Sequence, residues 1–156
     1  MLPISAILWP TDGSKPALRA LDAAIELAET FKAKLYALQV VSQVPTISET
    51  GYASASEIGF DVLLYEQELL KTAKDTLDKT VAEKVPKTIE VETHVELGWP
   101  ADVIIDFAGR NNVSLIVMST HGRTGISHLV LGSVTEKTVR KSSVPVLTVP
   151  GGTEDE

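Results

Sequence analysis

Residues 115–149 read LIVMSTHGRTGISHLVLGSVTEKTVRKSSVPVLTV, and this stretch decides the fold. Its first four residues, LIVM, are uniformly apolar, which is typical of a short central strand in a parallel sheet covered by helices on both faces. A glycine-containing loop follows, then a predicted helix over about 133–141 and a predicted last strand over 144–149. This order of strand, helix and strand indicates an α/β unit.

The same alternation runs through the preceding sequence. Short apolar or alternating runs predict strands, and apolar residues at helical spacing predict helices between them. Pro10 is expected to stop the first strand, and Pro16 suits the first turn of the helix that follows. The strands are predicted at 4–9, 34–41, 89–96 and 115–118, and the helices at about 16–31, 57–84 and 101–110. With the last strand, five strands predict a single open doubly wound α/β sheet of parallel strands with helices on both faces.

The chain length predicts one domain. A chain of 156 residues lies in the usual size range of a compact domain. We expect residues 1–150 to form it and residues 151–156, GGTEDE, to be an acidic tail. Residues 42–56 are rich in Ser, Thr, Gly and Ala and predict a long loop, whose action as a lid stays open.

Composition limits the partners and the location. The chain is 44% hydrophobic and 22% charged, as in soluble globular proteins, and carries a net charge of −7. This charge repels nucleic acid phosphates and anionic membranes. Cysteine is absent, no secretory signal is recognisable, and no apolar stretch approaches the ~20 residues of a membrane span. We therefore expect a cytoplasmic protein with no nucleic acid partner and no membrane insertion.

Two loops are candidates for a ligand site, because open parallel sheets bind ligands beyond the carboxyl ends of their strands. The first is PTDGS at 10–14, and the second spans 119–137. The second loop has small residues and glycines up to Gly132, and Ser133 stands where a helix begins. Backbone N–H groups at such a helix start favour phosphate.

Each of these features also has a purely structural interpretation. The glycines are compatible with an ordinary loop that binds no ligand, because glycine is common in turns and loops. Ser133 with Glu136 forms a Ser-x-x-Glu capping box, which also needs no ligand. Asp12 is able to accept hydrogen bonds from a base amino group or a ribose hydroxyl, but Asp-Gly-Ser is also a common turn sequence.

The sequence resembles the universal stress protein family over nearly its whole length. The resemblance is carried by PTDGS at 10–14, by ELGWPADVII at 96–105, and by residues 119–150. The family's glycine motif, G-x2-G-x9-G-[S/T], maps onto Ser119, Gly122, Gly132 and Ser133, so a serine stands at the first glycine position.

The resemblance implies an ATP site, with magnesium arriving on the nucleotide, in a protein that acts as a stress-response regulator or sensor. It also implies the strand order 3-2-1-4-5, which brings Asp12 and the glycine loop to one crevice. Asp12 and the backbone around Val40 would meet the adenine and ribose, and Met118 would lie under the nucleotide. The predicted nucleotide-binding residues are Pro10, Thr11, Asp12, Val40, Met118, Ser119, His121, Gly122, Arg123, Gly132, Ser133 and Val134.

The family commonly dimerises through its last strand, here residues 144–149, although Pro145 is also compatible with a protected edge in a monomer. The second function that stays open is a dimeric stress protein of the same fold that binds no nucleotide and acts through protein contacts.

Other function classes lack their motifs. A P-loop would need GK[ST] after the first strand, and a dehydrogenase would need G-x-G-x-x-G there. Asp12 stands without the acidic cluster of a phospho-receiver domain. The three histidines show no metal-ligand spacing, and no hydrolytic triad is indicated. We therefore expect no enzyme beyond slow ATP hydrolysis.

Overall fold

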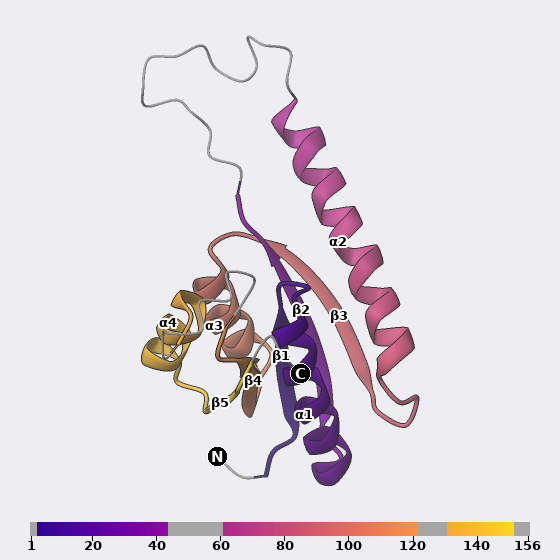
Figure 1. Ribbon diagram of the computed structural model, residues 1–156, viewed down its shortest axis with the longest axis vertical. Coiled ribbons are helices and arrows are strands. Elements are labelled where there is room, and N and C mark those ends of the chain that lie inside the picture. Colours follow the sequence, from indigo (N-terminus) through magenta and orange to yellow (C-terminus); the bar gives the residue numbers. More distant parts are fainter. Residues whose placement is uncertain (1–2, 44–60, 122–130, 152–156) are drawn as a thin grey trace.

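The computed structural model describes residues 3–43, 61–121 and 131–151 of the 156-residue chain. Five parallel strands form one sheet in the order β3-β2-β1-β4-β5, with helices on both faces, which confirms the predicted fold class (Figure 1). The elements are β1 Ala6–Thr11, α1 Lys15–Phe31, β2 Lys34–Val41, α2 Val62–Lys84, β3 Val91–Leu97, α3 Pro100–Arg110, β4 Leu115–Ser119, α4 Ser133–Lys141 and β5 Val146–Val149.

The core has one layer on each face of the sheet. On one face, α1 and α2 pack their apolar stripes against β1, β2 and β4, with Trp9 and Leu21 fully buried between them. On the other face, Phe107 of α3 is buried against Leu8 and Leu38. Strands buried on both faces explain the nearly continuous apolar runs of β1 and β4.

Local signals set the starts of α1 and α3. The Ser14 hydroxyl accepts a hydrogen bond from the Ala17 N–H at 3.4 Å and so caps α1. Gly98 turns the chain from β3 into α3 at φ +152°, and a Cβ there would come within 2.8 Å of Val103. Another residue at position 98 would therefore strain this turn.

The prediction that Pro10 ends the first strand was wrong. The strand continues through Pro10 to Thr11 and stays paired with β2, where Pro10 lies opposite Leu38. Its pairing with β4 covers Ile7 and Leu8, so Pro10 lies beyond it. Proline has no backbone N–H to donate to a neighbouring strand. The missing hydrogen bond destabilises the sheet least where one neighbouring strand has already diverged.

Other boundaries also differ from their predictions: β1 begins at Ala6 rather than at residue 4, and β3 at Val91 rather than at residue 89. The helix predicted from Glu57 begins at Val62, because Asp61 has an extended backbone and its carboxylate caps the Leu64 N–H at 3.1 Å. The last strand begins at Val146 rather than Val144. Residues 44–56 of the predicted loop and residues 152–156 of the predicted tail lie outside the described residues. None of the helices in the described ranges is both long and apolar enough to cross a membrane.

Candidate functional site

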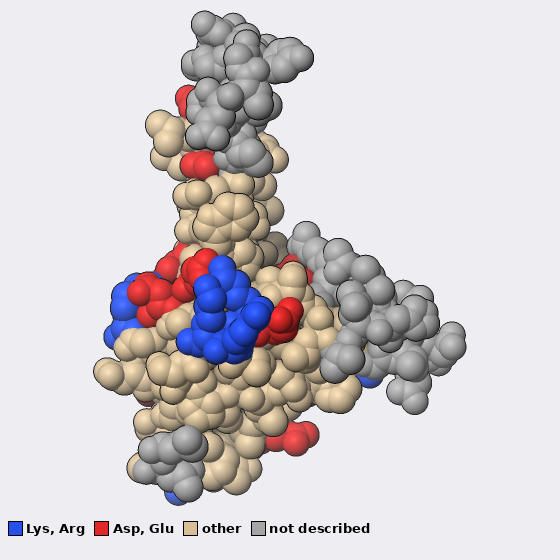
Figure 2. Space-filling model, turned by 90° about the vertical axis from the view of Figure 1, so that its left-hand side faces the viewer, with Lys and Arg blue, Asp and Glu red and all other residues tan. Residues whose placement is uncertain are grey.

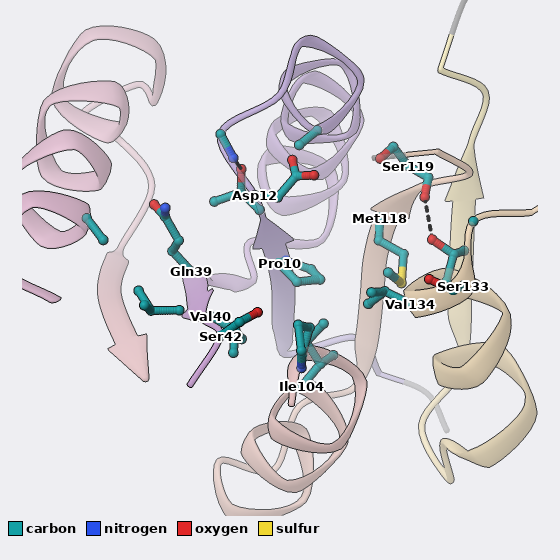
Figure 3. A pocket seen from close by; sticks show the side chains of 18 of the residues that line it. Pro10, Asp12, Gln39, Val40, Ser42, Ile104, Met118, Ser119, Ser133 and Val134 are labelled. Carbon is teal, nitrogen blue, oxygen red and sulfur yellow. Dashed lines mark hydrogen bonds between the residues drawn. The ribbon is translucent and has the colours of Figure 1, made fainter. Parts of the chain in front are cut away.

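A cavity opens at the carboxyl edge of the sheet, where β1 and β4 separate after Leu8 and Ile116. The winding direction reverses between these two strands, so the loops that follow them diverge. The cavity has a volume of about 770 Å³, and Figure 3 shows side chains from both faces of the sheet around it. Ten of the twelve predicted residues line it: Pro10, Thr11, Asp12, Val40, Met118, Ser119, His121, Gly132, Ser133 and Val134. Gly122 and Arg123 lie outside the described residues.

The N-terminus of α4 forms one end of this cavity. Gly132 is the N-cap, its backbone is extended, and no side chain caps the helix within the described ranges. The Gly132 carbonyl accepts a hydrogen bond from the Glu136 N–H at 2.8 Å. The N–H groups of the first helical turn, which precede Glu136, therefore have no acceptor within the helix. This geometry suits an anion, because the helix dipole adds partial positive charge to the exposed donors.

The predicted capping box at this helix was wrong. Ser133 is the first helical residue rather than the cap, so its hydroxyl is not in the capping position. The carboxylate of Glu136 instead pairs with Arg140 at 2.7 Å, one turn further along. The glycine before the helix takes the cap position with its backbone alone, which leaves the cavity side of the helix start free of a capping side chain.

The end of β4 is tied to the start of α4 by hydrogen bonds. The Thr135 hydroxyl donates to the Ser119 carbonyl at 2.8 Å, and the Gly132 N–H donates to the Thr120 carbonyl at 2.7 Å. The Ser119 hydroxyl donates to the His121 carbonyl at 2.6 Å. The serine at the first glycine position therefore directs its proton to the loop backbone.

Asp12 is a turn residue that also lines the cavity. Its carboxylate Oδ1 accepts from the Ser14 N–H at 2.9 Å, as expected of a turn residue before a capped helix. The same side chain lines the cavity at the end of β1 (Figure 3). A carboxylate there also places negative charge at the wall opposite the α4 side, so the cavity has one acidic and one donor-rich region.

Apolar side chains form the middle of the cavity. Pro10, Val40 and Met118 come from three adjacent strands, and Val134 joins them from α4 (Figure 3). This apolar centre between two polar regions is the usual composition of a small-molecule site.

Sequence analysis missed a second group of lining residues. Gln39 lies opposite Thr11 in the parallel register, and α2 presents one helical stripe to the cavity. The missed residues are Gly13, Ala17, Gln39, Val41, Ser42, Leu69, Thr72, Ala73, Thr76, Pro100, Ile104 and Thr135. The only available signal for the α2 stripe was its i, i+3, i+4, i+7 spacing, which does not reveal what the stripe faces.

A charged pair joins α3 and α4 beside the cavity. Figure 2 views the side of α3 and α4 and shows a group of Lys and Arg side chains bordered by acidic ones. Lys137 of α4 contacts Asp102 of α3 at 2.6 Å, and this hydrogen bond lowers the pKa of the Asp102 carboxyl. In the part of the chain that the structure describes, no cluster of three metal-ligating side chains is close enough to hold a metal ion.

Comparisons with known proteins agree with this architecture. The model of the universal stress protein family matches residues 3–150. The universal stress protein MJ0531 of Methanocaldococcus jannaschii is 36% identical over 145 residues, which cover 92% of this chain and 80% of that protein.

Two solved structures share the fold. One is that of the hypothetical protein MJ0577 of the same organism, with a TM-score of 0.80, 26% identity, and coverage of 98% of this chain and 100% of that one. The other is a universal stress protein from Archaeoglobus fulgidus in complex with dAMP, with a TM-score of 0.55 and 22% identity over 95% of this chain and 98% of that one. The second likeness shows the fold alone.

Proposed function

The chain belongs to the universal stress protein family, and from this premise we propose that it binds ATP and acts as a stress-response regulator or sensor. The observation that carries the proposal is the cavity at the strand switch point, with an uncapped helix N-terminus at one end and Asp12 at the other. Its volume of about 770 Å³ lies within the range of roughly 300–1,000 Å³ typical of small-molecule sites.

The phosphates are assigned to the start of α4. Gly132, Ser133 and Val134 all line the cavity there, and the first-turn N–H groups are the natural donors to an anion. Magnesium would arrive with the nucleotide and neutralise part of the phosphate charge. Gly122 and Arg123 belong to the same proposal on sequence grounds alone.

The nucleoside is assigned to the apolar centre and to the β1 end. Pro10, Val40 and Met118 offer apolar side chains to a purine ring, and Thr11 lines the same cavity. The Asp12 carboxylate accepts the Ser14 N–H through Oδ1, and a carboxylate, which has about four acceptor sites, is the type of group that a sugar hydroxyl or a base amino group binds. The dAMP complex of the Archaeoglobus protein supports an adenine nucleotide on this scaffold.

The proposed role is regulatory. We propose a cytoplasmic homodimer, paired through its last strand, that changes its contacts with nucleotide state and hydrolyses ATP slowly at most. Ser133 and the other proposed phosphate neighbours supply donors for binding rather than a nucleophile with an activating base.

One observation favours the alternative of a stress protein that binds no nucleotide. Ser119 occupies the first glycine position of the family motif, and its hydroxyl donates to the His121 carbonyl instead of facing a ligand as a donor. Protein contacts would then be the sole means of action.

Calorimetric titration of the purified protein with MgATP tests the proposal, preceded by denaturation to release and identify any bound small molecule. We expect Ser133→Asp to weaken ATP binding at least about tenfold, because a carboxylate at the helix start repels phosphate. The same carboxylate should stabilise the free protein by about 0.3–1 kcal/mol through the α4 dipole. A destabilised fold therefore cannot account for the lost affinity.

Ser133→Asn is the matched control, because it is similar in size and carries no charge. It should keep ATP affinity close to that of the wild type. Absence of MgATP binding to the wild type, or equal affinity of Ser133→Asp and Ser133→Asn, would contradict the proposed site.

A further inference from the structure

The cavity continues on the α2 side of the sheet, away from the start of α4. The residues that line this side are Gln39 of β2 and a stripe of α2, and together we call them the α2 wall: Gln39, Leu69, Thr72, Ala73 and Thr76. The members of the stripe are three, four and seven residues apart, so they lie on one face of the helix. Because α2 packs against β2, the stripe and Gln39 border the same part of the cavity.

Gln39 lines the cavity at the end of β2 (Figure 3). Strand residues alternate between faces, so Gln39 lies on the same face of β2 as Leu35 and Ala37, which pack in the core that includes α2. Among residues 3–43, 61–121 and 131–151, no protein group hydrogen-bonds to its side-chain amide. One carbonyl and one NH₂ group are therefore available to a ligand, whose polar groups would replace water there.

The two threonines of the α2 wall differ from other helical threonines in their hydrogen bonds. The hydroxyls of Thr30, Thr80 and Thr138 donate to the carbonyl four residues earlier, at distances between 2.7 and 2.9 Å. In the described part of the chain, the hydroxyls of Thr72 and Thr76 make no such bond. The α2 wall thus has one amide and two hydroxyls but no ionisable side chain, and it suits an uncharged group that has both donors and acceptors.

The order of the strands determines which end of a nucleotide reaches the α2 wall. The strands β2, β1 and β4 are neighbours, and α4 follows β4 along the chain. Neighbouring strands lie about 4.8 Å apart, so β2 is about 10 Å from β4. A nucleotide with its phosphates at the start of α4 and its ring on the apolar centre directs the outer edge of the base toward β2.

We propose that the side-chain amide of Gln39 binds the hydrogen-bonding edge of the base. Adenine has an amino donor next to a ring-nitrogen acceptor, and an amide offers the matching acceptor and donor. Since no group in the described ranges holds the amide in one orientation, it turns to match this edge. The inference rests on the proposed function: it assigns the base edge to the α2 wall and leaves the Asp12 carboxylate to the sugar.

Calorimetric titration with two ligands tests whether Gln39 meets the amino group. MgATP is compared with the magnesium complex of purine riboside triphosphate, which lacks only that amino group. Wild type should bind MgATP about fivefold more tightly, which corresponds to one ordinary hydrogen bond. Gln39→Leu should bind MgATP about tenfold more weakly than wild type and should not distinguish the two ligands. Gln67→Leu, an exposed change on α2 outside the cavity lining, is the matched control and should keep both wild-type affinities.

The side-chain amide resonances of the wild type, measured by ¹⁵N NMR, provide a test that does not depend on the folding of a variant. The Gln39 resonance should shift more on addition of MgATP than on addition of the analogue, and the Gln67 resonance should not move. An unchanged Gln39 resonance in protein that binds MgATP would overturn the inference and leave the proposed function intact. A Gln39→Leu variant that keeps the preference for the amino group would do the same. Absence of MgATP binding to the wild type would overturn both.

Discussion

Ser119 occupies the first position of the glycine motif, where the family has glycine. It is the last residue of β4 and is 8% exposed, and its hydroxyl donates to a carbonyl two residues ahead, that of His121. Its backbone does not have the positive φ that would demand glycine; the non-glycine residues with positive φ in the described ranges are Lys32 and Asn112. A serine is therefore accommodated at the first motif position without backbone strain.

Restoring glycine at this position tests whether the hydroxyl matters for binding. We expect Ser119→Gly to keep ATP affinity within about threefold, and to lower the free energy of unfolding by about 0.5–1.5 kcal/mol through loss of the hydrogen bond to His121. Calorimetry and urea denaturation measure the two effects. Ser142→Gly is the matched control, because the Ser142 hydroxyl also donates to a carbonyl two residues ahead but does not line the cavity. A tenfold gain in affinity for Ser119→Gly would show that the serine obstructs the nucleotide.

At the scale of elements, a polar anchor joins α2 to the edge strand β3. Lys74 of α2 donates to Asp78 one turn further along and to the Thr93 hydroxyl of β3, at 2.7 and 2.8 Å. The Thr93 hydroxyl also donates to Asp78. Because α2 supplies one wall of the cavity, this anchor holds a part of the site as well as the edge of the sheet.

The polar anchor predicts that the free energy of unfolding depends on pH through Asp78. The hydrogen bond from Lys74, and next that from Thr93, lowers the pKa of Asp78 below the ordinary value of about 3.9. A lowered folded-state pKa stabilises the protein fully above the unfolded value, and this contribution is lost as pH falls through the folded value. Asp78→Asn should therefore reduce the free energy of unfolding at pH 7, by less than about 1 kcal/mol because the side chain is 46% exposed.

Urea denaturation of wild type and Asp78→Asn at pH 7, and again below the lowered pKa, measures this difference. It should shrink at the lower pH, where wild-type Asp78 is itself protonated. Asp75→Asn, an exposed change on the same helix, should alter stability little at either pH. A difference between wild type and Asp78→Asn that is as large in acid as at pH 7 would contradict the assigned role of the carboxylate.

At the scale of the whole molecule, β5 is an edge of the sheet. Leu147 on this strand is 41% exposed, and Val139 on the neighbouring α4 is 45% exposed. An edge strand with exposed apolar side chains is a ready template for pairing with a second copy. The proposed dimer through the last strand would cover these side chains.

We therefore expect Leu147→Lys to convert a dimer into a monomer, because a charge would be buried at the interface. Light scattering coupled to size-exclusion chromatography measures the mass. Leu63→Lys is the control, because Leu63 is 71% exposed on α2, away from this edge of the sheet, and should leave the mass unchanged. A monomeric wild type, or a dimer that survives Leu147→Lys, would rule out this interface.

The sequence alone determined the order of elements and much of the site. The uniformly apolar run at 115–118 predicted a central strand, and the helix predicted over 133–141 is observed as α4. These features depend on the period of apolar residues and on prolines and glycines within a few positions, so they can be recognised locally. The family resemblance added the strand order and ten of the residues that line the cavity.

Only the tertiary structure decided which groups meet. Pro10 lies inside β1 because β4 has already diverged, and Gly132 rather than Ser133 caps α4. Gln39 and the α2 stripe reach the cavity, and the Thr120 hydroxyl meets the chain 31 residues later. Strand register and helix packing depend on contacts between segments far apart in the chain, so the short-range pattern of residues does not contain them.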